Sequence, residues 1–571
     1  MWNDGFRRTV QPVVELILGP ILRHVDRSSA TIWCETDRPC VVEVLSQPTK
    51  TFTVDGHHYA LVIVEGLQAG SCTEYDVRLD GVVAWPPPDS TFPSSVIRTV
   101  GDGSVRMLFG SCRTAAPHEP PYTLEFALDP KGRGYDALRA HALRMMHQPV
   151  DQWPHIAVML GDQIYADDSS PVTRERIAQK RKSQTMEDGL SPDVVHGFEE
   201  YCWLYHESWS PDVERWFFSV VPTAMIFDDH DMIDDWNISD SWVREIRQQS
   251  WWDDHVVGGL ATYWIYQHLG NLSPAEIRSQ GMLAALLEMD DGHQYLQSWA
   301  LQSEEFTPVP GGYRFSFTRR LGDVMLVVID ARNGRVLQPG HRSMVDDDEW
   351  AWIVDQCTTG RNADARHVVI GTSLPVFVPG GIDGLQRWNE RVCDGAWGRP
   401  GTWLGEKVRR GLDLEDWPAF ERSFQSFVEL LAQLGGSHQP SPPSTIAILS
   451  GDIHFSFHAR IHFPPSMAMV SNVHQLVNSP IRNALRPFER VAMRVAMSRT
   501  GKVIGRSLRR LSGGSSSPLR WTLDHGPVFS NCLGLLTFQD EAASMRLERA
   551  TVDDDGAPQL EIAFDVDLLA D

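Results

Sequence analysis

Six apolar runs between residues 105 and 454 restrict the fold of this chain more than any other feature. They are short, rich in Val, Ile, Leu and Met, and separated by long stretches of helical character. In order they read VRMLFGSC, HIAVMLGD, TAMIFDDHD, DVMLVVIDARN, HVVIGTSLP and TIAILSGDIH. Runs of this kind are typical of strands that helices bury on both faces, so the sequence predicts a layered α/β domain.

Almost every one of these predicted strands ends in Cys, Asp, His, Asn or Ser. In open α/β sheets, ligands bind at the carboxyl ends of the strands, so the polar ends predict one common site. The strand ends supply Asp162, Asp229, His230, Asp452 and His454. Carboxylate and imidazole groups are the ligands that Fe, Mn, Ca or Zn prefer, and the sequence therefore predicts a metal centre.

Two further side chains bear on the identity of the metal. Tyr165 follows Asp162 after two intervening residues, which lets both side chains reach the same side of a turn. A phenol becomes a phenolate ligand only beside a strongly acidic cation, and this favours ferric iron over magnesium. Cys112 could supply a thiolate to the same ion; the alternative is an ordinary buried thiol.

The first hundred residues have a different pattern. Short runs such as SATIWCET, TFTVDG and YALVIVEGL alternate apolar and polar residues between Gly, Asp and Pro. They predict a small β-sandwich over residues 1–103, followed by the α/β domain with helical insertions over residues 104–571. The N-terminal segment has no small-residue cleavage site after its apolar stretch, so we expect no signal peptide and a cytoplasmic location.

Charge separates one segment from the rest of the chain. The formal net charge is −24, and a protein this acidic lacks the basic surface that generic nucleic-acid binding needs. Residues 481–512 nevertheless contain nine Arg or Lys against one Glu. Two interpretations stay open: the segment lies on an anionic membrane, or it packs as an arginine-rich helix against the acidic body of the protein.

The motifs GSCR, GDQIY, FDDHD, SGDIH and QLVNSPIRN resemble those of the alkaline phosphatase D (PhoD-like) metallophosphatases, relatives of the purple acid phosphatases. The resemblance covers almost the whole chain. It implies a fibronectin-like β-sandwich in front of an αββα layered metallophosphoesterase domain. It also implies hydrolysis of phosphoric monoesters or diesters by a metal-activated hydroxide at a dinuclear or larger site.

The same resemblance implies a set of ligands. Cys112, Asp162, Tyr165 and His454 would surround a ferric ion. Asp162 would also bridge to a divalent site with Asp229 and Asp452, for which the family suggests calcium, with Zn, Mn and Mg as alternatives. A histidine ligand that many relatives supply has no obvious counterpart, because the matching strand ends in Thr372 and Ser373.

Three residues are candidates for catalysis. Arg113 and Arg332 could hold phosphoryl oxygens, since guanidinium matches phosphate bidentately; the alternative for Arg332 is an ion pair with Asp330. His230 is the candidate general acid for the leaving alcohol, with Asp231 placed to bias its protonation. The partner would be a phosphate ester. The alternative function is a non-catalytic metal-binding module whose sandwich docks a partner, and the oligomeric state stays open.

Overall fold

The computed structural model describes residues 13–184, 191, 193–305, 313–359, 364–514, 517–553 and 556–569. The first twelve residues, part of the segment in which we expect no signal peptide, lie outside this part of the chain. Antiparallel β-sheets come first, and a larger part with alternating strands and helices follows. The predicted fold class, an α/β domain preceded by an all-β sandwich, is confirmed.

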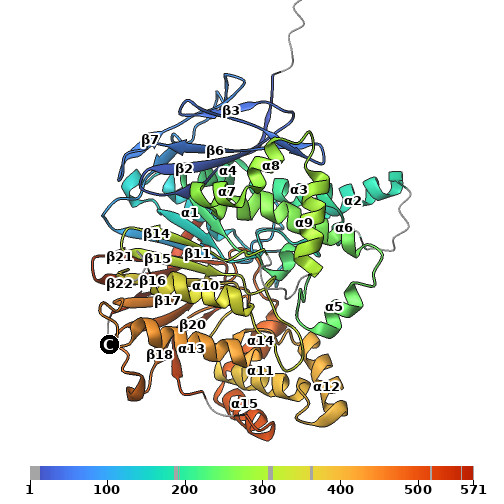
Figure 1. Cartoon of the computed structure of the whole chain (residues 1–571), viewed down its shortest axis with the longest axis vertical. Coiled ribbons are helices and arrows are strands. Elements are labelled where there is room, and N and C mark those ends of the chain that lie inside the picture. Colours follow the sequence, from blue (N-terminus) through green and yellow to red (C-terminus); the bar gives the residue numbers. More distant parts are fainter. Residues whose placement is uncertain are drawn as a thin grey trace, which may run out of the picture.

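The N-terminal sandwich, blue in Figure 1, consists of two four-stranded antiparallel sheets with the orders β1-β2-β6-β5 and β4-β3-β8-β9. Their strands are β1 (Leu16–Val25), β2 (Ser29–Thr36), β3 (Val41–Val44), β4 (Gln47–Lys50), β5 (Phe52–Val54), β6 (His57–Glu65), β8 (Val77–Leu79) and β9 (Val82–Trp85). A third, two-stranded sheet pairs β7 (Cys72–Glu74) with β10 (Val96–Arg98).

Both faces of the first sheet are buried, and β2 shows how. Ile32 and Cys34 point into the core between the two sheets of the sandwich. Trp33, on the opposite face, belongs to the core of the larger part. Successive side chains of a strand point to opposite faces, so one strand serves two cores and every residue of β2 is buried. The sandwich therefore packs on the larger part through an extensive apolar face.

The larger part contains two sheets. One is six-stranded, with the order β13-β12-β11-β21-β22-β23, and the other is seven-stranded, with the order β14-β15-β16-β17-β19-β18-β20. Their strands are β11 (Val105–Gly110), β12 (Ile156–Met159), β13 (Thr223–Met225), β14 (Phe317–Leu321), β15 (Val324–Ile329), β16 (His367–Thr372), β17 (Thr445–Ser450), β18 (Ser456–His462), β19 (Asn472–Val477), β20 (Arg520–Val528), β21 (Cys532–Gln539), β22 (Ala542–Val552) and β23 (Pro558–Asp567). All six apolar runs form strands, three in each sheet.

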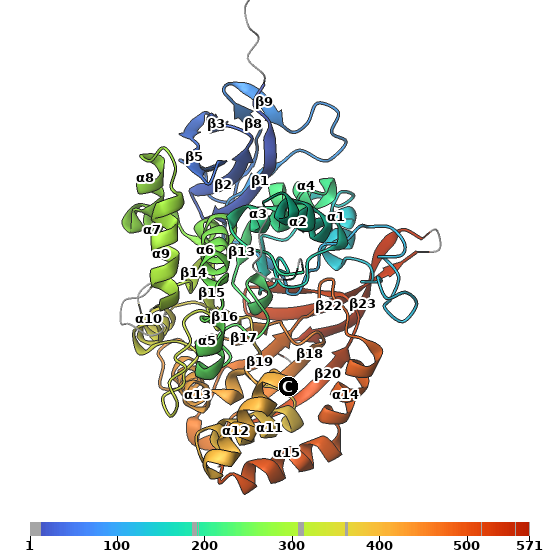
Figure 2. The ribbon, with the colours of Figure 1, turned by 90° about the vertical axis from the view of Figure 1, so that its right-hand side faces the viewer.

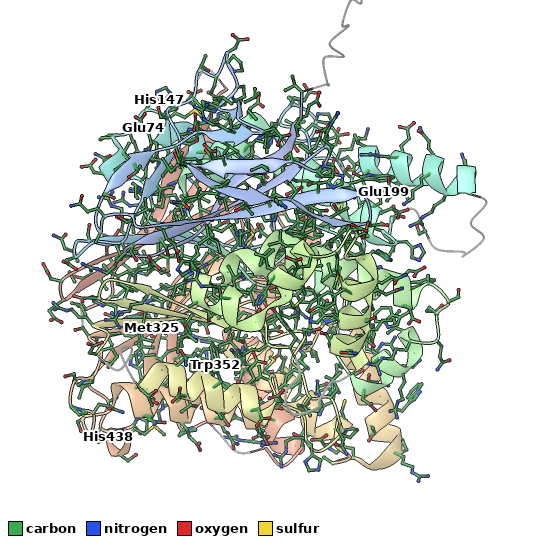
Figure 3. The ribbon with its side chains drawn as sticks, turned by 45° about the horizontal axis from the view of Figure 1, so that its top comes forward. Glu74, His147, Glu199, Met325, Trp352 and His438 are labelled. Atoms are coloured by element: carbon green, nitrogen blue, oxygen red, sulfur yellow. The ribbon has the colours of Figure 1, made fainter. Side chains whose placement is uncertain are left out.

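Alternation along β15 shows that the two sheets are stacked. Leu326 and Val328 share a core with the six-stranded sheet. Met325 and Val327 belong instead to a second core, which Trp352 of α10 (Asp347–Thr358) helps to cover. Met325 and Trp352 are both labelled in Figure 3. The inner face of the seven-stranded sheet therefore packs on the other sheet, and its outer face packs on helices.

Helices complete a four-layered arrangement. Residues of α10 and α13 (Glu421–Gly435) cover the outer face of the seven-stranded sheet. On the six-stranded sheet, α1 (Ala137–Met145) packs on β22 and β23, with α4 (Asp212–Val220) beside it. Figure 2 shows α1 and α4 above the stacked sheets and α13 below them. The layers thus follow the order α, β, β, α.

Further helices flank these layers. They are α2 (Pro171–Gln184), α3 (Phe198–Trp209), α5 (Asp240–Ile246), α6 (Trp252–Thr262), α7 (Pro274–Gln280), α8 (Met282–Leu287), α9 (His293–Glu305), α11 (Gly380–Cys393), α12 (Gly398–Gly411), α14 (Pro487–Met497) and α15 (Arg499–Leu511). Residues 185–190 of the predicted insertion after residue 174 lie outside the described chain. The aromatic residues of α3 and α6, such as Tyr201 and Trp252, are buried. In the described ranges, no helix has the length and apolar character needed to cross a bilayer.

Candidate metal centre

The loops after four strands bring the predicted ligands together. Cys112 follows β11, Asp162 follows β12, Asp229 follows β13, and Asp452 and His454 follow β17. Strands β11, β12 and β13 run parallel to one another, and so do β15, β16 and β17. Their carboxyl ends meet at one end of the stacked sheets, although the strands belong to two different sheets. The site therefore depends on the stacking as well as on each strand.

The backbone at these strand ends adopts an unusual conformation. Four of the predicted ligands have a positive φ: Cys112 (57°), Asp162 (51°), Asp452 (64°) and His454 (56°). Such values are uncommon for residues other than glycine, and they persist only where the surroundings enforce them, as at functional sites. Gly161 has a φ of 105°, and a Cβ there would lie 2.3 Å from the Cβ of Asp228. A glycine is needed here because the loops after β12 and β13 approach so closely.

The first group of donors consists of Cys112, Asp162 and His454, whose ligand atoms lie within 4.8 Å of one another. The Ser479 hydroxyl donates to Cys112 Sγ at 3.2 Å. Tyr165, the fourth predicted ligand, donates from its hydroxyl to Asp162 Oδ2 at 3.3 Å. Thus all four residues expected around the ferric ion lie together.

A second group shares Asp162 with the first. Asp162, Asp228, Asp229 and Asp452 also place ligand oxygens within 4.8 Å of one another. Asp162 is thus positioned between a group with sulfur and imidazole donors and a group with carboxylates alone. Asp228 was not among the predicted ligands, although the FDDHD motif contains it.

Some buried carboxylate oxygens of this centre have no hydrogen-bond donor among the residues that the structure describes, whereas buried polar groups normally have one. Asp162 Oδ1 and Asp228 Oδ2 are buried and accept no hydrogen bond from the described residues. Burial, and then the neighbouring Asp228 carboxylate, raise the pKa of Asp162 and Asp452 well above the usual range. Burial and Asp162 likewise raise the pKa of Cys112 and Tyr165. A cation would neutralise these groups in their ionised form, so the donors fit a metal ion.

Two other clusters of donors contrast with this one. Each oxygen of Glu35 accepts a hydrogen bond, one from His57 at 3.1 Å and the other from His206 at 2.8 Å. In the other cluster, Glu214 pairs with Arg113 at 3.2 Å and Arg139 at 2.9 Å. These carboxylates are neutralised by protein donors, whereas those of the candidate centre are only partly neutralised. Within the described chain, unpaired oxygens therefore distinguish the site at the strand ends from these two clusters.

Arg332 lies within the carboxylate group. Its guanidinium is fully buried and bonds to Asp228 and Glu415, while Nη2 lies 3.1 Å from Asp229 Oδ1 and 3.2 Å from Asp452 Oδ1. Asp330 instead accepts the backbone N–H of Arg332 at 2.9 Å. The guanidinium thus pairs with carboxylates of the candidate centre, whereas Asp330 contacts the backbone of Arg332.

His230 has a different partner from the one expected. Its Nδ1 lies 2.8 Å from Asp167 Oδ1, and a quarter of its side chain is exposed. Burial alone would lower the pKa of His230, but the Asp167 and Asp229 carboxylates raise it well above the usual value. Asp231, the expected partner, accepts the backbone N–H groups of Asp162 and Asp228 at 3.1 and 3.0 Å. Asp231 therefore fixes the loops, and Asp167 orients His230.

Arg113 does not lie among the metal donors. Its Nε donates to Asp136 at 2.9 Å, Nη1 donates to the Ser208 carbonyl at 2.8 Å, and Nη2 pairs with Glu214 at 3.2 Å. The side chain is almost fully buried in this network. All its donor nitrogens are thus occupied, and in this conformation it does not have the expected position for a group that holds phosphoryl oxygens.

Known proteins resemble this chain in one region of sequence and in overall fold. The model of a domain of unknown function, DUF7800, matches residues 13–97. No curated protein matches the chain in sequence. Among solved structures, the chain is similar to a structure of PhoD, with 10% identity, coverage of 96% of this chain and 88% of that chain, and a TM-score of 0.49.

A second similar structure is a dimetal phosphatase from Danio rerio, with 9% identity, coverage of 81% of this chain and 99% of that chain, and a TM-score of 0.27. Since both TM-scores are below 0.5, the function of this chain is inferred from the site itself.

Sequence patterns missed four groups that contact the site. Asp228, Asp167 and Glu415 supply carboxylates, and Asn483 donates to the Tyr165 hydroxyl at 2.9 Å. In the sequence, only the first Asp after the Phe of FDDHD and the position of Asn483 at the end of QLVNSPIRN indicated these groups.

The strand end at which many relatives have a histidine ligand carries Thr372 in this chain. Thr372 accepts a hydrogen bond from Trp417 Nε1 at 3.3 Å. His458 lies on β18, where its Nε2 is 3.0 Å from His474 Nδ1.

Proposed function

We propose that this protein is a metal-dependent phosphoric ester hydrolase. One observation carries the proposal: the buried Asp162 is shared by the overlapping groups of metal donors and has an oxygen with no partner among the described residues. Two cations close together suit phosphoryl transfer, which needs positioning and neutralisation of charge more than covalent chemistry. Both monoesters and diesters fall within the proposal.

The donors support different ions in the two positions. Cys112, Tyr165 and His454 would join Asp162 around a ferric ion, because thiolate, phenolate and imidazole suit a strongly acidic transition metal. Asp229 and Asp452, with Asp228 added, would join Asp162 around the second ion. We propose calcium there, because a group made of carboxylates alone is hard. When bound, the cations would neutralise phosphoryl oxygens and lower the pKa of water for in-line attack.

The chain's own residues complete the reaction. Asp167 holds His230 by Nδ1, which leaves Nε2 to donate a proton to the leaving oxygen. Arg332 favours the ionised form of Asp228, Asp229 and Asp452 and holds these carboxylates in place, and we assign it this positioning role in addition to the predicted one. Asn483 orients the Tyr165 hydroxyl.

The proposal is tested by the metal content of protein purified without added metal, together with hydrolysis of aryl phosphates. We expect about one iron and a divalent ion per chain, activity on a nitrophenyl monoester or diester, and loss of that activity with a chelator. Bound metal without any hydrolysis would favour the non-catalytic metal-binding module instead. Protein that binds no metal even after reconstitution would contradict both functions.

A second experiment tests the role of His230. The His230→Gln variant should lose about 10²-fold or more in turnover of alkyl phosphates, whose leaving group needs a proton. Nitrophenyl phosphates should lose much less, because nitrophenolate leaves without protonation. Metal content should stay unchanged. Because His230 also lies in a donor group with Asp162 and Asp229, loss of metal would identify it as a ligand and remove it from the acid role.

A further inference from the structure

The basic segment forms two consecutive surface helices, α14 and α15, at the end of the molecule opposite the N-terminal sandwich (Figure 1). Figure 2 shows α15 along the lower edge of the molecule, with α14 beside it. Six large apolar side chains of these helices are more than half exposed: Phe488 (67%), Val491 (57%), Val495 (58%), Val503 (59%), Ile504 (53%) and Leu511 (69%). We call these side chains, and the cations among them, the α14–α15 surface.

Helix α14 is apolar on two opposite faces. Met493 and Met497 pack inward against a small core that includes Phe529. Phe488, Val491 and Val495 recur at helical spacing on the other side, where a surface helix normally carries polar residues. The outward face is therefore not explained by packing within this chain.

Helix α15 attaches through glycine, which leaves its larger side chains outside. A Cβ on Gly384 of α11 would lie 2.3 Å from the backbone of Gly505, so the two helix backbones are in direct contact. Gly505 is buried, while Val503, Ile504 and Leu511 are exposed. The apolar residues of α15 thus lie on the surface because small residues provide the packing.

Most cations of this surface have no acidic partner within the part of the chain that the structure describes. Arg486, Arg494, Arg499, Lys502, Arg506 and Arg510 are exposed. Among the described residues, only Arg509 of the two helices forms an ion pair, at 3.8 Å from Asp383. An arginine-rich segment held against the acidic body of the protein would need several such pairs. The positive charges of this surface therefore face solvent and are available to an anionic partner, although the formal net charge of the protein is −24.

Tryptophan extends the same surface. Trp397, 43% exposed, donates from Nε1 to the Leu511 carbonyl at 3.4 Å. Exposed Trp beside Arg, Val and Ile is typical of residues that lie at the boundary between lipid headgroups and acyl chains.

We propose that the α14–α15 surface docks on an anionic lipid bilayer, with its apolar side chains in the headgroup region and its cations against lipid phosphates. Cations and apolar side chains on one helix face are the combination that interfacial helices use. Nucleic acid would engage the cations but leave the apolar residues exposed. Asn483, which bonds to Tyr165, lies four positions before the first residue of α14, so docking brings the candidate centre toward the membrane. The proposal does not depend on hydrolase activity.

Flotation with vesicles tests this proposal on the full chain. The protein should bind vesicles that contain phosphatidylglycerol, should bind pure phosphatidylcholine far less, and should dissociate as salt rises. Replacing Arg499, Lys502, Arg506 and Arg510 by Ser should lower the partition coefficient by at least about 100-fold. Val503→Ser with Ile504→Ser should weaken the binding that persists in high salt.

The matched control removes the same number of cations elsewhere. Arg278, Arg422, Arg546 and Arg549 are about half exposed and each forms a surface ion pair. Replacing these four by Ser should leave vesicle binding unchanged, and far-ultraviolet circular dichroism should show that both variants are folded. Absence of vesicle binding, equal binding to neutral vesicles, or equal loss in the control would overturn the proposal.

Discussion

Replacing Asp162 by Asn is expected to abolish ester hydrolysis, with turnover reduced by at least about 10³-fold. Asp162 is the donor shared by the two groups, so the substitution removes a negative charge from both metal positions at once. Metal ions contribute several kcal/mol to the stabilisation of such transition states, and each 1.36 kcal/mol corresponds to a factor of ten in rate. Hydrolysis of an aryl phosphate and the metal content of the purified variant are the measurements.

Stability provides a readout for this variant that does not depend on catalysis. In the metal-free protein, Asp162 is 1% exposed and Oδ1 has no partner among the described residues, so a neutral amide should not lower the melting temperature. Added metal should raise the melting temperature of the original protein and raise that of the variant much less. The control is Asp234→Asn in the neighbouring loop after β13, since Asp234 belongs to no donor group of the described residues. If added metal raised the melting temperature of Asp162→Asn as much as that of the original protein, the proposed ligand role of Asp162 would be contradicted.

The fold was predictable because the relevant signals are local. Apolar runs such as those of β15 and β17 are long and uninterrupted, and each is followed by a polar residue at the strand end. Strand β2 was predicted with its observed bounds, Ser29–Thr36. The division of the strands between two stacked sheets was implied by the family resemblance and not by the runs themselves, because periodicity says nothing about which strands pair.

The candidate site was only partly predictable, because only some of its residues belong to a local sequence pattern. Cys112, Asp162 and His454 follow buried strands, and this local pattern predicted them. Asp167 and Glu415 lie in loops with no such pattern, and they reach the site through contacts that the chain makes over long sequence distances. For His230, adjacency in sequence suggested Asp231, but the loop geometry turns that carboxylate toward backbone N–H groups.

The contacts of Arg332 differ most from those expected from the sequence, and replacing this residue should have the largest effect on stability. Replacing it by Met removes the only guanidinium that pairs with Asp228 and Asp229 in the described structure. Loss of one partner of a buried ion pair typically costs about 3–5 kcal/mol, because an uncompensated charge stays buried. We therefore expect the metal-free variant to unfold at a clearly lower urea concentration.

The pH dependence of the destabilisation distinguishes the loss of the Arg332 charge from a simple loss of packing. Burial raises the pKa of Asp229, but Arg332, together with His230 and Arg335, more than offsets burial, so the folded pKa lies below the usual value. This contribution to stability is present above the unfolded pKa and is lost as pH falls through the folded one. The destabilisation of Arg332→Met should therefore be large at pH 7 and should shrink as the carboxylates become protonated below about pH 4.

The matched control is Arg278→Met, which breaks an exposed ion pair with Glu65 at 3.1 Å. An exposed pair contributes at most about 1 kcal/mol, so this variant should unfold almost as the original protein does, at either pH. A destabilisation of Arg332→Met that is the same at pH 7 as it is well below about pH 4 would mean that its packing matters and its charge does not. That outcome would also remove the reason for assigning Arg332 to the ligand carboxylates.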